Sequence, residues 1–214
     1  IWFLSIPIGL SAQMVNNGAQ FTVSGSTTVS GIPTLTNGGT INNEGTIQLT
    51  GDLINQQAYD GSGELVLLGA SQEIDLDDSV AILTLGGSGD HFLSSSLQVS
   101  DQMNFNNSRL LSNDFLTLQE AVTVSNPTSS AYVVGALSVS GTSDMTFPIG
   151  TSTNYLPVDI STIDGTNPQL TVEAVESDPA GIAGKNLLAV SNDKYWDISL
   201  SSGSISSYEV NLPV

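Results

Sequence analysis

The clearest structural signal in the chain lies in residues 39–55, which read Gly39-Thr-Ile-Asn-Asn-Glu-Gly-Thr-Ile-Gln-Leu-Thr-Gly-Asp-Leu-Ile-Asn55. Apolar and polar residues alternate within each short run, which predicts β-strands that each have one buried face. Asparagine and glycine separate the runs, and both residue types accept the left-handed backbone angles of tight corners. Short strands joined by such corners are typical of a β-solenoid, in which the chain winds in stacked turns.

The same pattern continues from Gln20 to about Ser140, with further corners at Asn106-Asn107 and Ser112-Asn113-Asp114. No segment has the apolar spacing of an amphipathic helix, so the sequence predicts an all-β protein. A β-sandwich would favour longer strands at a spacing of about 8–12 residues. We therefore predict a right-handed parallel β-helix over residues 13–142. The distances between its runs are too irregular for a fixed period.

The composition changes in residues 143–214. Three prolines (Pro148, Pro157 and Pro168) fall among longer alternating runs, such as 169–175 and 195–200. This pattern predicts an antiparallel β-sandwich-like domain with a core of its own, to which Trp196 contributes. Because the last residues, 210–214, read as part of a strand, we expect this domain to be truncated at its carboxy terminus.

The amino terminus is apolar: residues 1–10 read IWFLSIPIGL and are followed by Ser11-Ala12-Gln13. Such a run is too short to span a bilayer but matches the hydrophobic region of a secretory signal. We interpret residues 1–12 as a truncated signal peptide. The mature chain is then expected outside the cell or on a bacterial cell surface, without insertion into the membrane.

Composition excludes several classes of function. The chain has 214 residues, 21 Asp and Glu against 3 Lys and Arg, and a formal net charge of −18. Nucleic-acid binding needs clustered basic residues, and Arg109, Lys185 and Lys194 are the only ones. The absence of cysteine excludes disulfides, thiolate metal sites and cysteine nucleophiles.

Catalytic signals are sparse. His91 is the only histidine, it lies in the glycine-rich segment 86–92, and no Gly-x-Ser-x-Gly motif is present. We expect His91 to be a polar turn residue. A glycoside hydrolase would need two carboxylates at a defined separation, for which Asp75 and Asp77 are candidates. We interpret them instead as part of a solvated corner, and the sequence predicts no enzyme.

Two acidic clusters are weak candidates for calcium, which binds oxygen ligands. One is Asp60 with Glu64, and the other is Asp75, Asp77 and Asp78. Neither matches the spacing of an EF-hand, and the glycine-rich segment 86–90 carries a single, shifted copy of a calcium-binding nonapeptide. We favour flexible acidic turns as the explanation of both clusters, and no other cofactor is expected.

Several segments resemble a family of large Bacteroidetes surface proteins that are exported by the type IX secretion route. The likeness covers nearly the whole chain, including a signal ending Leu-Ser-Ala-Gln, and the last segment is its most specific part. It implies a β-helical stalk with sandwich modules and an adhesin-like role, although the carboxy-terminal sorting domain of that family is missing here. The segments are 39–55, Gly69-Ala-Ser-Gln-Glu-Ile74, Tyr132-Val-Val-Gly-Ala-Leu137, Phe147-Pro-Ile-Gly150, Tyr155-Leu-Pro-Val158 and Tyr195-Trp-Asp-Ile-Ser199.

Together these features predict a non-catalytic extracellular scaffold, structural or adhesin-like, of a bacterial cell-surface protein. The alternative is a carbohydrate-binding or polysaccharide-degrading β-helix protein. Surface glycans and other surface proteins are the partner classes that fit either function. The sequence leaves the oligomeric state open.

Overall fold

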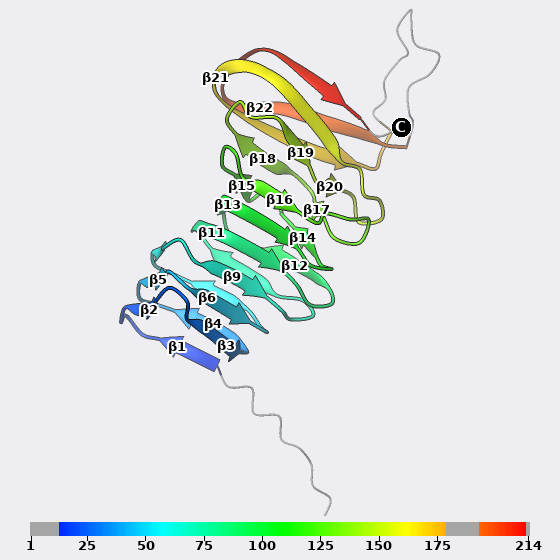
Figure 1. Cartoon of the computed structure of the whole chain (residues 1–214). Coiled ribbons are helices and arrows are strands. Elements are labelled where there is room, and N and C mark those ends of the chain that lie inside the picture. Colours follow the sequence, from blue (N-terminus) through cyan, green and yellow to red (C-terminus); the bar gives the residue numbers. More distant parts are fainter. Residues whose placement is uncertain (1–12, 179–192, 213–214) are drawn as a thin grey trace, which may run out of the picture.

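The computed structural model describes residues 13–178 and 193–212, and this part of the chain is an all-β structure of stacked turns (Figure 1). The predicted all-β solenoid is confirmed. The interpretation of residues 1–12 as a signal peptide, and Lys185, lie outside the described residues. Residues 13–178 and 193–212 contain no helix of the length and apolar character that crossing a membrane requires.

Sheet A forms one side of the stack and is parallel throughout. Each of its strands follows its neighbour by one turn of the chain, so strand order and sequence order agree. Its eight strands are β1 (Gln13–Asn16), β4 (Thr34–Asn37), β7 (Leu53–Asn55), β10 (Glu73–Leu76), β12 (Asp90–Leu93), β14 (Arg109–Leu111), β17 (Val133–Val134) and β20 (Ile149–Gly150).

Sheet B forms a second side in the first three turns only. In the turns above it, longer strands of sheet C take the place of sheet B, and their pairing has a register shift between Val80 and Ile82, where the strand bends. Sheet B contains β2 (Phe21–Val23), β5 (Ile41–Asn43) and β8 (Tyr59–Asp60).

Sheet C is the largest, and its strands are parallel up to β18. The last strands reverse direction: β21 pairs antiparallel with β18, β19 and β22. The sheet contains β3 (Thr28–Ile32), β6 (Thr46–Leu49), β9 (Glu64–Leu67), β11 (Asp78–Leu85), β13 (Leu97–Phe105), β15 (Leu116–Leu118), β16 (Thr123–Ser125), β18 (Leu137–Ser140), β19 (Met145–Phe147), β21 (Val158–Val175) and β22 (Tyr195–Asn211).

The alternating sequence pattern becomes rows of side chains along the stack. Parallel pairing in register places equivalent residues above one another, so inward positions form continuous apolar rows. Burial of each such side chain contributes about 1.5–3 kcal/mol. One row consists of Ile47, Leu65, Leu83 and Met103, all with no exposed surface.

The corners behave as the sequence predicts. Asn107, Asn113 and Asp114 have positive φ angles of 77°, 48° and 66°, in the left-handed region that asparagine and aspartate tolerate. The turns differ in length, because equivalent residues are 21 positions apart between Asn16 and Asn37, but 18 between Asn37 and Asn55. The expected irregular period is therefore confirmed.

The carboxy-terminal region is a long antiparallel hairpin, β21–β22, that continues sheet C beyond the last turn (Figure 1). Parallel stacking extends to Gly150, where β20 pairs with β17. Val158, Ile160 and Val172 belong to the same apolar cluster as the solenoid interior, in place of the separate core that the sequence suggested. The buried face of β21 therefore covers the upper end of that interior.

Candidate functional site

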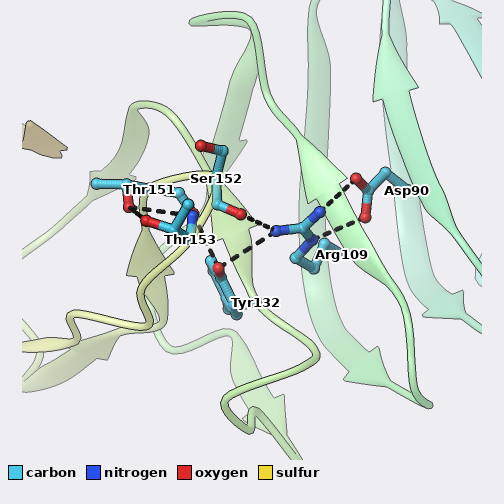
Figure 2. A network of polar contacts seen from close by, with 6 residues as sticks. All are labelled: Asp90, Arg109, Tyr132, Thr151, Ser152 and Thr153. Carbon is cyan, nitrogen blue, oxygen red and sulfur yellow. Dashed lines mark hydrogen bonds and ion pairs between the residues drawn. The ribbon is translucent and has the colours of Figure 1, made fainter. Parts of the chain in front are cut away.

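A network of polar contacts is centred on Arg109, on the outer face of sheet A (Figure 2). Residue 109 lies next to Asp90 in the adjacent strand because β12 and β14 pair in register. The guanidinium donates from Nε to Asp90 Oδ1 at 2.7 Å and from Nη2 to Asp90 Oδ2 at 2.6 Å. Such bidentate geometry is the strongest form of an arginine–carboxylate pair.

The other side of Arg109 contacts later turns. Its Nη1 donates to the carbonyl oxygen of Ser152 at 2.5 Å and to the Tyr132 hydroxyl at 3.4 Å. The guanidinium carbon lies 5.8 Å from the centroid of the Tyr132 ring, within the range of a cation–π contact. The Tyr132 hydroxyl in turn donates to the carbonyl oxygen of Thr151 at 2.8 Å, and its ring packs on that of Tyr155 at 5.3 Å.

This network is structural rather than reactive. The hydrogen bonds to Asp90, and to a smaller extent the one to Tyr132, raise the pKa of the Arg109 guanidinium, so the side chain stays charged. Each of its three nitrogen atoms already has a protein acceptor. Arg109 therefore joins the loop at 151–152 to the earlier turn that contains Asp90. Few of its N–H groups remain to bind a ligand.

His91 lies inside the stack, and the prediction of a polar turn residue is wrong. It belongs to β12 and is fully buried, because the strand begins at Asp90 and directs residue 91 inward. Its Nε2 lies 2.8 Å from the carbonyl oxygen of Gly86, while Nδ1 has no hydrogen-bond partner among the described residues. Burial lowers the pKa of His91, although Gly86 and Asp90 act in the opposite direction.

The acidic calcium candidates lie at separate positions. Asp60 is exposed at the end of β8, and Glu64 at the start of β9 accepts a hydrogen bond of 2.6 Å from Thr84. Asp75 lies on β10, in sheet A, and Asp77 lies at the exposed corner between β10 and β11. Asp77 thus lies at the predicted corner, whereas Asp75 lies within a strand and not at the corner.

Asp78 has a structural role at that corner. Its two carboxylate oxygens each accept a backbone N–H at 2.8 Å, one from Tyr59 and one from Ser79. Asp77 and Asp78 border a shallow hollow of about 220 Å³ together with Ser79, Ser96 and Gln98. Across residues 13–178 and 193–212, no three histidine or acidic side chains come close enough together to bind a metal ion.

Another hollow lies on the terminal hairpin. It measures about 400 Å³, and neither acidic, basic nor histidine side chains line it. Trp196, which was expected in the core, lies on β22 and is half-buried. Its Nε1 donates to the carbonyl oxygen of Leu156 at 3.0 Å. The lining residues are Leu170, Ile198, Ser199, Leu200, Ile205, Ser206, Ser207 and Tyr208.

A ladder of three asparagines, of which Asn37 and Asn55 are buried and Asn16 is half-buried, was not predicted. Asn16, Asn37 and Asn55 end consecutive strands of sheet A and are joined through their side-chain amides. The signal for this ladder was present in the sequence, because an apolar residue precedes each asparagine by two positions.

Comparison with protein-family models, curated proteins and solved structures yields no match for this chain.

Proposed function

We propose that this chain is a non-catalytic structural scaffold, adhesin-like and extracellular, whose stacked turns hold other modules at a distance. The observation that carries the proposal is the use of its polar side chains. Asparagine, arginine and aspartate side chains connect one turn to the next, as in Asn37–Asn55 and Arg109–Asp90. These side chains stabilise the stack, and their hydrogen bonds within it leave them less able to act on a substrate.

The groups that a hydrolase would need are arranged differently. Of the two candidate carboxylates, Asp75 lies within β10 of sheet A and Asp77 lies at the exposed corner that follows it. The neighbouring Asp78, the first residue of β11, already accepts two backbone N–H groups. His91, the only histidine, is buried without exposed surface. A general acid or base must reach the substrate proton directly or through one water molecule. The burial of His91 and the backbone hydrogen bonds of Asp78 therefore favour the scaffold over a hydrolase.

A panel of polysaccharides tests the catalytic alternative. The purified chain is incubated with neutral, acidic and sulfated polymers, and the release of reducing ends and of unsaturated products is measured. We expect no turnover. Depolymerisation that disappears in Asp75→Asn or Asp77→Asn, but not in the matched exposed variant Asp60→Asn, would show an enzyme and overturn the scaffold function.

The extracellular location has its own test. Intact cells that produce the natural protein are treated with a protease that cannot enter them, and the chain is followed by immunoblotting. We expect the chain to be cleaved while a cytoplasmic marker stays intact. Protection of both proteins until lysis would exclude a surface scaffold.

A further inference from the structure

The two ends of the stack are finished differently. At the upper end the hairpin β21–β22 covers the interior (Figure 1). At the lower end β1, β2 and β3 pair only with β4, β5 and β6, and their other edges face no strand in the described part of the chain. Solenoids generally need a polar cap at each end.

The lower end also lacks electric charge. Glu44 is the first charged residue in a chain with a net charge of −18. The whole first turn, from Gln13 to Pro33, is therefore uncharged. Proteins commonly protect open strand edges with charged side chains, especially lysine, and β1, β2 and β3 contain none.

Val23 and Ile32 of the first turn are buried, but three other apolar side chains of that turn are not fully covered. In-register pairing places Met14 below Leu35, Phe21 below Ile41 and Val29 below Ile47. The upper member of each pair has no exposed surface, whereas the lower member is only half-buried. On the outer face of β1, Val15 is 52% exposed. Within residues 13–178 and 193–212, these three interior rows thus end at Met14, Phe21 and Val29.

We propose that this uncharged end is an interface through which two copies of the chain associate, with β1 of one copy pairing antiparallel with β1 of the other. We choose a second copy as the partner because the negative charge of the other surfaces would oppose contact between two copies there, whereas this end carries no charge. Two molecules of net charge −18 repel one another, and the repulsion is smallest where the contacting turns contain no charge. A two-fold axis would bring the same neutral surface from both copies together.

The dimer would be weak. Stable interfaces bury about 800 Å² on each partner, and the end of one turn, with strands of three to five residues, is small by comparison. Salt should strengthen the association, because it screens the repulsion between the two acidic molecules while leaving apolar contacts in place. This inference does not depend on the scaffold function.

Sedimentation velocity at increasing concentration, up to about 1 mM as befits a small interface, tests the proposal at low and high salt. We expect the mass to rise from 22.2 kDa toward twice that value, more readily at high salt. Val15→Glu and Thr22→Glu, both on exposed positions of the first turn, should each weaken the dimer by up to about 5-fold, because they place like charges opposite one another. The control is Gln98→Glu, which adds the same charge at an exposed position in the middle of sheet C.

Two results would overturn the proposal. The first is a wild-type chain that stays monomeric over the whole concentration range. The second is a dimer that persists in both Val15→Glu and Thr22→Glu, or that is lost instead in Leu200→Glu, on the exposed edge strand β22. Circular dichroism of each variant shows that its β structure is retained.

Discussion

The side-chain amide of Asn37 donates a hydrogen bond of 2.6 Å to the side-chain oxygen of Asn55, 18 residues further along the chain. Asn16 donates to Asn37 in the same way, also at 2.6 Å. Asn37 and Asn55 additionally donate to the backbone at their own corners, to Gly39 and Gln57 respectively. The row ends above Asn55, where its register partner is Leu76. Successive corners of the lower stack are thus joined by a chain of side-chain amides, of which those of Asn37 and Asn55 are buried.

Replacement of Asn37 by alanine should therefore destabilise the protein by about 2–3 kcal/mol, because it leaves buried polar groups of Asn55 and Gly39, and the half-buried amide of Asn16, without their partner. Urea denaturation at neutral pH measures the change in free energy of unfolding. The control is Asn42→Ala, in the next strand, where the asparagine lies at an outward position of β5. Equal effects of the two substitutions would contradict a stabilising ladder.

Part of this architecture could be predicted from the sequence. Alternation identified the strands of sheet C, such as 46–50 and 64–68, and the Asn-rich corners correctly indicated left-handed backbone at Asn107 and Asn113. These features are local, since each depends on a residue and its immediate neighbours.

Contacts between turns were harder to predict. Asp90 and Arg109 are 19 residues apart, and Arg109 and Tyr132 are 23 apart, so no fixed repeat places them together. His91 was assigned to a turn because glycines precede it, yet the in-register pairing of β12 with β14 directs it inward. Side-chain networks of this kind follow from the register, and an irregular period hides the register.

The corner glycines lead to a second prediction, because successive turns approach too closely for a side chain. A Cβ atom at position 51 would collide with the carbonyl oxygen of Pro33 in the turn below. Backbone atoms cannot move aside cheaply, so Gly51→Ala should lower the free energy of unfolding by about 3 kcal/mol. At Gly25 the nearest atom to such a Cβ is the Glu44 carbonyl oxygen at 3.5 Å, an ordinary contact, and Gly25→Ala serves as the control. Similar thermal midpoints for the two variants would exclude a steric effect of stacking.

Buried His91 makes the protein sensitive to acid. Burial lowers the pKa of His91 in the folded state, whereas in the unfolded chain it is near the ordinary value of about 6.5. The unfolded state therefore binds the proton more readily, and protonation favours unfolding. The stability that His91 permits is fully present above about pH 6.5 and is lost as the pH falls from there toward the lowered folded-state pKa.

The measurement is urea denaturation at several pH values between 5 and 7.5, with His91→Gln as the comparison. Glutamine retains an N–H donor for the Gly86 carbonyl but does not titrate. We expect the wild-type free energy of unfolding to fall by up to about 1.4 kcal/mol per pH unit more than that of the variant below pH 6.5. Parallel pH profiles for the two proteins would show that His91 does not titrate on unfolding in this range.

The Arg109–Asp90 pair can be tested with a double-mutant cycle. The two side chains are 26% and 37% exposed, so solvent screening limits their coupling energy to about 1 kcal/mol. Arg109→Met should nevertheless cost more than Asp90→Ala, because it also removes the contacts to Ser152 and Tyr132.

The double variant should then be less destabilised than the sum of the single variants, and the difference should shrink at high salt. Arg109→Met combined with Asp60→Ala is the control, since Asp60 has no contact with the arginine network and the two effects should add. Strict additivity in the Arg109–Asp90 cycle would mean that the clip between the turns contributes geometry but no stability. The coupling energy therefore measures how firmly the loop at 151–152 is held to the earlier turns.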